Sequence, residues 1–125
     1  MGNLMSTIKA NDLTNVAGGI PTVKGQQLIP TAWVNFNGTG TVAIRDSENV
    51  SSITDVTTGQ YIINFTTANA NYAVSGMSQG SGYTSSYLSL NGNYTTSTIG
   101  IRCISHTGSY IDSPDVMVNV MGGQA

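Results

Sequence analysis

Apolar and polar positions alternate along most of the chain with a period of two, in short runs separated by Gly, Asn, Asp and Ser. The alternation is clearest from residue 32 to residue 77. A period of two places successive side chains on opposite faces of a β-strand, and the residues between the runs favour tight turns. The pattern therefore predicts an all-β fold, built in this region as a chain of antiparallel hairpins.

The runs divide the chain into strands and turns. Strands are expected at residues 32–37, 42–45, 50–55, 60–66, 72–77, 87–90, 96–105 and 116–121. Turns are expected at residues 37–40, 46–49, 57–59 and 69–71, a tight Asn-Gly turn at 91–93, and loops at 78–86 and 106–114. Within one strand, Tyr61, Ile63 and Phe65 would share one face and Ile62 the other. The predicted architecture is an antiparallel β-sandwich.

Several of these strands are apolar on both faces, although the outer face of a lone sandwich should be polar. The surplus predicts a second buried surface between chains. Scattered exposed apolar residues are also normal in soluble proteins, which is the alternative. The residues assigned to inter-chain packing are Trp33, Ile62, Met77, Met117 and Met121.

Residues 1–30 differ from the rest, because they hold both lysines and two of the three prolines. They are interpreted as an N-terminal extended arm, and residues 31–125 as the β-sandwich knob. Residues 6–16 could form a short helix, or an irregular thread that orders only against other chains or a docking partner. The apolar positions assigned to attachment by the arm are Ile8, Leu13, Val16, Ile20 and Val23.

Charged residues make up only 8% of the chain, so hydroxyl and amide groups must supply its solubility. Four basic residues against six acidic ones leave no basic stripe, which argues against nucleic-acid binding. A chain with so few charges is expected to associate with itself. It has no leader-like start and no apolar run long enough to span a membrane, so synthesis in a cytoplasm and no membrane insertion are expected.

Catalytic chemistry is not expected. Cys103 and His106 would point to opposite faces of a strand, and an inert buried cysteine is the simpler interpretation. His106 with Asp112 and Asp115 formally resembles a hydrolase set, but no strand-turn-helix elbow holds a nucleophile. No cofactor and no metal site are predicted.

The later loops instead have the composition of binding loops. Tyrosines stand there among Ser, Gly, Asn and Thr, so that rigid amphipathic rings lie beside adaptable hydrogen-bonding groups. Such a surface can stack on a sugar ring and satisfy its hydroxyls, although any one tyrosine could instead cap the core. The candidate receptor-binding residues are Tyr83, Tyr87, Tyr94, His106, Tyr110 and Asp112.

The segments IKANDLTNVAGG, AWVNFNG, IRDS, NVSSITD and YIINFTT together resemble the C-terminal tip, or knob, domains of bacteriophage tail fibres. The resemblance covers roughly residues 8–77. It implies a homotrimeric virion protein, assembled in the host bacterial cytoplasm, whose arm attaches to another virion component. The knob would adsorb to a surface glycan or an outer-membrane receptor of the host. A capsid or neck decoration protein with a purely structural role, or a depolymerase, are the alternatives.

Overall fold

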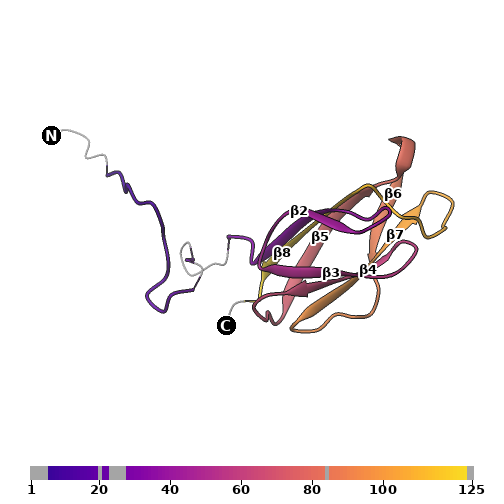
Figure 1. Cartoon of the computed structure of the whole chain (residues 1–125). Helices are drawn as coiled ribbons and strands as arrows, with labels where there is room; N and C mark the ends of the chain where they lie inside the picture. Colours follow the sequence, from indigo (N-terminus) through magenta and orange to yellow (C-terminus); the bar gives the residue numbers. More distant parts are fainter. Residues whose placement is uncertain (1–5, 20, 23–27, 84, 124–125) are drawn as a thin grey trace.

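The computed structural model describes residues 6–19, 21–22, 28–83 and 85–123. Two four-stranded antiparallel sheets face each other (Figure 1). In spatial order, the first sheet contains β2 (Ala43–Glu48), β1 (Ala32–Asn37), β8 (Asp115–Gly122) and β5 (Tyr72–Gln79), and the second contains β3 (Val50–Thr57), β4 (Gln60–Phe65), β7 (Thr98–Ser105) and β6 (Ser86–Leu90). The described residues contain no α-helix, only the short 3₁₀ turn η1 (Ser81–Tyr83). The predicted all-β fold with antiparallel sheets is confirmed.

The core lies between the two sheets and is built from the alternate positions that the sequence pattern predicts. Tyr61, Ile63 and Phe65 of β4 are buried, as expected for one face of that strand. Aromatic pairs join the sheets near both ends of the sandwich. Phe36 meets Tyr61 edge to face with ring centroids 5.3 Å apart, and Phe65 meets Tyr72 in the same way at 5.4 Å.

Within residues 32–77, the expected chain of consecutive hairpins is wrong at two steps. The steps from β2 to β3 and from β4 to β5 cross from one sheet to the other, and β1 pairs with β8 as well as with β2. The turn expected at residues 46–49 is also wrong, because β2 continues to Glu48 and Asn49 alone separates it from β3.

Asn49 makes this crossing possible. It has the left-handed φ of 55° that asparagine tolerates better than most residues. Its side chain donates to the carbonyls of Thr31 and Thr67 and accepts from the Thr67 amide. One side chain therefore ties the start of β1 to the end of the hairpin in the opposite sheet.

The tight turn expected at residues 91–93 is a longer loop, because β7 begins only at Thr98. β6 and β7 still pair as neighbours. The Asn91 amide donates to the Gly100 carbonyl, and the Gly100 amide donates to the Asn93 carbonyl, so the loop folds back along β7. A Cβ at Gly100 would lie 2.9 Å from that of Asn93, so a side chain there would push the loop away.

The two ends of the sandwich are distinct. We call the end where β1 begins the proximal end; it carries residues 66–71 and the loop 91–97. The distal end carries residues 38–42, 58–59, 80–83, 85 and 106–114. The described part of the first thirty residues contains neither strand nor helix and lies outside the sandwich on the proximal side (Figure 1). Ile8, Leu13 and Val16 are exposed there, and Ile20 and Val23 lie outside the described residues.

A matched pair of valines tests which strand positions form the core. Val118 of β8 is buried between the sheets, whereas Val56 of β3 is half exposed. Val118→Ala should lower the free energy of unfolding by about 2–3 kcal/mol, because it removes buried methyl groups and leaves a cavity. Val56→Ala should change it by less than about 0.5 kcal/mol. Denaturant unfolding measures both, and equal losses would contradict the observed faces.

Candidate functional site

The most developed polar surface lies on the outer face of the second sheet, around Arg102 of β7. Arg102 stands directly opposite Gln60 on one neighbouring strand and Ser89 on the other. Ile104, next on the same face, stands opposite Tyr87 and forms a β-bridge with Tyr110. We call this area the Arg102 surface, and its residues are Gln60, Tyr87, Ser89, Asn91, Arg102, Ile104 and Tyr110.

Hydrogen bonds and a ring contact hold the guanidinium group in place. The Arg102 Nε donates to Asn91 Oδ1 at 2.6 Å, and Asn91 Nδ2 donates to Gln60 Oε1 at 2.9 Å. The Arg102 Cζ lies 5.6 Å from the centroid of the Tyr110 ring, within the range of a cation–π contact. The cation is thus oriented from both sides before any ligand arrives.

The aromatic members of the surface are open to solvent. Tyr87 is 53% exposed and Tyr110 is 43% exposed. The Tyr110 ring lies beside the fixed cation, and Tyr87 stands opposite Ile104 on the same face, which also carries amide and hydroxyl groups. An amphipathic ligand, such as a sugar ring with polar substituents, could contact apolar rings and hydrogen-bonding groups here at once.

The structure brings together only part of the predicted receptor-binding set. Tyr87 and Tyr110 lie on the Arg102 surface. His106 is exposed in the distal loop beside it, where its amide donates to the Ser85 carbonyl. Tyr83 ends η1, also at the distal end, and its side chain is outside the described part of the chain. These four residues therefore share one end of the molecule.

Tyr94, in contrast, lies at the proximal end and is used for packing. Its ring centroid is 4.5 Å from that of Tyr72, and its hydroxyl donates to the Tyr72 carbonyl. The Tyr72 hydroxyl in turn donates to the carbonyl of Thr95 at 2.6 Å. These contacts attach the loop 91–97 to the first sheet, so Tyr94 does not join the other tyrosines in one surface.

The carboxylate of Asp112 forms hydrogen bonds with two other residues at the distal end. Its Oδ1 accepts hydrogen bonds from the Gly59 amide at 2.8 Å and from the Tyr61 hydroxyl at 3.0 Å. The Tyr61 hydroxyl also lies 2.7 Å from the Gly38 carbonyl oxygen. Gly59 has a left-handed φ of 66°, and a Cβ there would lie 2.7 Å from the backbone of Ile111. The Asp112 carboxylate therefore links its own loop to the turn at residues 58–59 and to β4, although the residue remains exposed.

Sequence reasoning missed the residues that organise this surface: Arg102, Asn91 and Gln60. They lie in three different strands or loops, and only the register of β4, β7 and β6 places them side by side. One signal was available. Arg102 and Arg45 are the only cations among residues 31–125, and Arg102 interrupts a run of otherwise apolar residues.

The residues predicted for inter-chain packing fall on two different surfaces. Trp33, Met77, Met117 and Met121 lie on the outer face of the first sheet, where Met77 stands directly opposite Met117. Met77 is 70% exposed and Met117 is 43% exposed. Ile62 instead faces outward from the second sheet, opposite Thr54 and Gly100.

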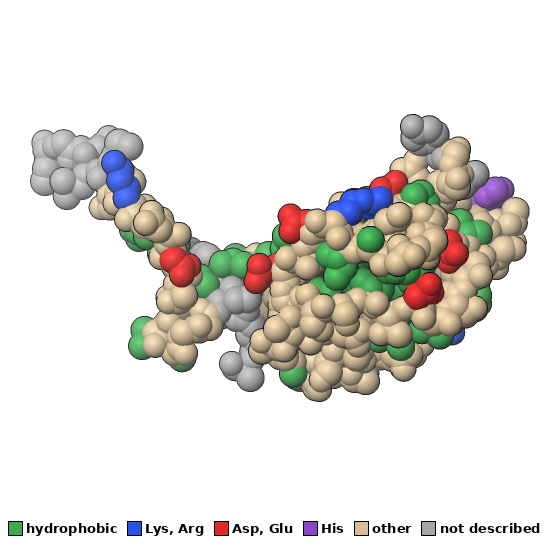
Figure 2. Space-filling view, in the orientation of Figure 1, with side chains coloured by type: hydrophobic (Ala, Val, Ile, Leu, Met, Phe, Trp, Pro, Cys, Tyr) green, Lys and Arg blue, Asp and Glu red, His purple; other side chains and the backbone are tan. Residues whose placement is uncertain are grey.

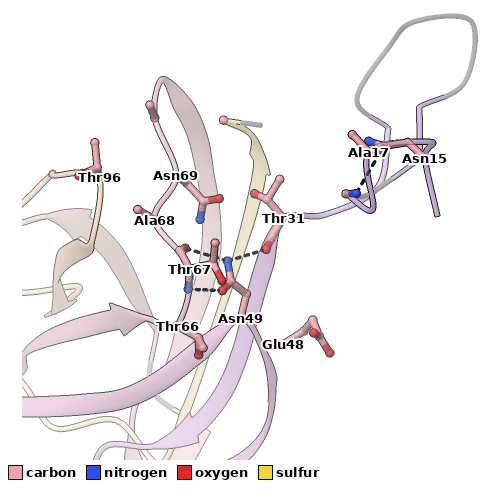
Figure 3. A pocket seen from close by; sticks show the side chains of 13 residues that line it. Asn15, Ala17, Thr31, Glu48, Asn49, Thr66, Thr67, Ala68, Asn69 and Thr96 are labelled. Atoms are coloured by element: carbon pink, nitrogen blue, oxygen red, sulfur yellow. Dashed lines mark hydrogen bonds between the residues drawn. The ribbon is translucent and has the colours of Figure 1, made fainter. Parts of the chain in front are cut away.

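A hollow of about 860 Å³ lies at the proximal end, between residues 15–19 and the ends of the sheets (Figure 3). Asn49, Thr67 and Asn69 line its sandwich side. Asn69 is buried, and its Nδ2 has no hydrogen-bond partner among the described residues. The hollow lies at the proximal end, whereas Tyr87 and Tyr110 of the Arg102 surface lie toward the distal end.

Three further features lack support in the described part of the chain: a reactive thiol, a metal site and a membrane-spanning helix. Cys103 is fully buried, and burial raises the pKa of its thiol, which keeps it in the unreactive protonated form. The described residues include no group of three or more histidine, cysteine or acidic side chains placed to hold a metal ion. No helix formed by them is long and apolar enough to cross a bilayer.

No family model, curated protein sequence or solved structure matches the chain. Function is therefore inferred from the chemistry and placement of its surfaces.

The buried tyrosines give a pH dependence with a definite sign. Burial, assisted by the nearby Tyr94, raises the pKa of Tyr72 to about 12. Burial and the hydrogen bond to Asp112 raise the pKa of Tyr61 as well. In the unfolded chain both phenols ionise near pH 10. Above that pH the unfolded chain releases protons that the native chain holds, so the free energy of unfolding should fall as the pH rises from about 10 toward 12.

Denaturant unfolding across this range, combined with the ultraviolet absorbance of phenolate, measures the effect. Tyr72→Phe should make the alkaline fall less steep, because its proton no longer contributes. Val56→Ala serves as the control and should leave the slope unchanged, because that exposed side chain carries no titratable group. Similar slopes for the wild type and Tyr72→Phe would contradict the assigned burial effect.

Proposed function

We propose that the chain is a virion protein, a small bacteriophage tail fibre or fibre tip, whose trimeric β-knob adsorbs to a glycan or outer-membrane receptor on a bacterial host. The observation that carries the proposal is the Arg102 surface. Its exposed tyrosines lie toward the distal end, with the oriented cation beside Tyr110. Figure 1 shows the described part of the first thirty residues at the opposite end of the sandwich. A receptor-binding tip needs this separation between its attachment segment and its adsorbing surface.

The low charge of the chain supports adsorption through hydrogen bonds and ring contacts. In Figure 2 uncharged polar side chains and backbone cover most of the visible face of the sandwich, with hydrophobic side chains in a strip near its middle. Asn, Thr and Ser groups of this kind exchange hydrogen bonds with sugar hydroxyls at little desolvation cost compared with charged groups. Binding through one such surface is weak, and three copies on a knob would raise the effective affinity through avidity.

The outer face of the first sheet supports self-association. Trp33, Met77, Met117 and Met121 lie on it, and its central positions, Asn35, Ser75 and Asn119, carry no charge. Its charged residues on β2, Arg45, Asp46 and Glu48, lie along one edge. Thioether side chains adapt to an opposing surface, so a methionine-rich sheet face suits contact with further copies of the chain. This contact leaves the Arg102 surface free, because that surface is on the other sheet.

The first thirty residues would then attach the knob to another virion component. Ile8, Leu13 and Val16 are exposed, and a partner could bury them. The proximal hollow adjoins the same segment, so attachment there would not obstruct the distal end.

Mass measurement in solution tests the assembly. The wild-type chain should have three times the mass of a single chain. Met117→Lys should shift the population toward the monomer, because it places a charge in the proposed contact. Val56→Lys, on an exposed strand of the other sheet, is the control and should remain trimeric. A monomeric wild type at micromolar concentration would contradict the trimer.

Adsorption to cells tests the surface. Labelled protein is incubated with a panel of bacterial strains, and the bound fraction is measured by cell sedimentation. Tyr110→Ala should reduce binding at least about tenfold, since several copies each lose a ring contact. Tyr94→Phe is the control at the proximal end and should bind normally. Undiminished binding by Tyr110→Ala and by Tyr87→Ala would contradict adsorption through this surface and favour a decoration role.

A further inference from the structure

The two cations of the sandwich are in opposite electrostatic situations. Arg45 is neutralised by Asp115, whose Oδ1 lies 3.3 Å away, and it also donates to the Pro114 carbonyl at 2.6 Å. Arg102 forms no ion pair with any residue in the described part of the chain. In a protein with so few charges, this unpaired guanidinium is a distinct feature of the outer face.

Within the described residues, the neighbours of Arg102 orient its side chain but engage only one of its nitrogen atoms in a hydrogen bond. Its Nε is the donor to Asn91, and its plane is held near the Tyr110 ring. The two Nη groups make no hydrogen bond within the described residues. Nη1 and Nη2 form the edge of the guanidinium fork that matches the two oxygens of a carboxylate or phosphate. Because the guanidinium group is already held in place, little side-chain entropy is lost when it binds a carboxylate or phosphate.

The groups around the fork fit a sugar ring. Tyr87 and Tyr110 present exposed rings on its distal side. Ser89, directly opposite Arg102, contributes a hydroxyl at the strand edge, and Gln60 contributes an amide on the other side. Apolar contact, hydrogen bonds and one cation therefore occur within a single patch.

We propose that the Arg102 surface binds an anionic saccharide, whose carboxylate or phosphate is held by the two Nη groups of Arg102 while its ring lies beside Tyr87 and Tyr110. The inference rests on the proposed receptor-binding function and specifies the class of receptor. It requires that the acidic group contribute to the affinity, which a purely neutral glycan receptor would not show.

Matched oligosaccharides test the role of charge. Oligogalacturonate and its full methyl ester have the same rings and length, but only the first carries carboxylates. Phosphorylated and unphosphorylated mannan form the corresponding pair for phosphate. Calorimetry and NMR titration of the full chain should show at least about tenfold tighter binding for the acidic member of one pair, and the pair that shows it identifies the anion. The preference should fall with added salt.

Substitutions connect the preference to Arg102. Arg102→Gln should abolish the difference between the acidic and neutral members, and Arg102→Lys should reduce it, because lysine keeps the charge but lacks the fork. Arg45→Gln is the matched control and should preserve the difference. Asn91→Asp provides a second approach that keeps Arg102 in place: the new carboxylate would pair with the guanidinium and should also abolish the preference.

The outcomes separate the two proposals. Equal binding of acidic and neutral oligosaccharides by the wild type, or an unchanged preference in both Arg102→Gln and Asn91→Asp, would overturn the anionic-saccharide inference. If the wild type still adsorbs to cells and Tyr110→Ala does not, the receptor-binding function stands without it. Failure of adsorption altogether would overturn the broader function.

Discussion

The buried hydroxyl of Tyr61 is the constraint on which the distal end depends. Tyr61 fills the core against Phe36, so its hydroxyl must find hydrogen-bond partners away from water. It finds them in Gly38 and Asp112. Asp112 then fixes the loop that follows β7, and Tyr110, two residues earlier, is held near Arg102. Packing in the core thus determines where an exposed ring lies on the outer face.

The dependence of the surface on contacts between residues far apart in the chain explains why the sequence predicted the strands better than the site. Alternation is a local property, so the buried faces of β1, β4, β7 and β8 could be identified from spacing alone. Pairing is not local. β1 lies beside β8 across nearly the whole chain, and the steps that change sheets are set by details such as the left-handed backbone of Asn49. Turn-forming composition marked that position as a turn but could not distinguish a hairpin from a crossing.

The tyrosines show the same limit at the level of single residues. Tyr83, Tyr87, Tyr94 and Tyr110 have similar polar surroundings in the sequence, yet Tyr94 packs on Tyr72 at the proximal end while Tyr87 and Tyr110 lie on the Arg102 surface. Asp112 lies in a loop with the composition of a binding loop, but its carboxylate accepts a hydrogen bond from the buried phenol of Tyr61. Arg102 had no sequence neighbour to indicate its role. Its partners come from β4 and from the loop after β6, and only the register of the second sheet brings them together.

The two outer faces differ in a way that makes assembly and binding compatible. On the first sheet, Arg45 pairs with Asp115, and Asp46 and Glu48 of the edge strand β2 stand opposite Asn35 and Trp33. The central part of that face presents methionine and uncharged polar groups. On the second sheet, Arg102 has no ion-pair partner among the described residues, and the exposed ring of Tyr110 lies beside it. The uncharged central part of the first face could be buried against another copy while the charges of β2 stay at its edge in solvent, whereas burial of Arg102 would need an anion. The charge distribution therefore favours the first sheet for contact between copies and leaves the second sheet for a ligand that brings its own negative charge.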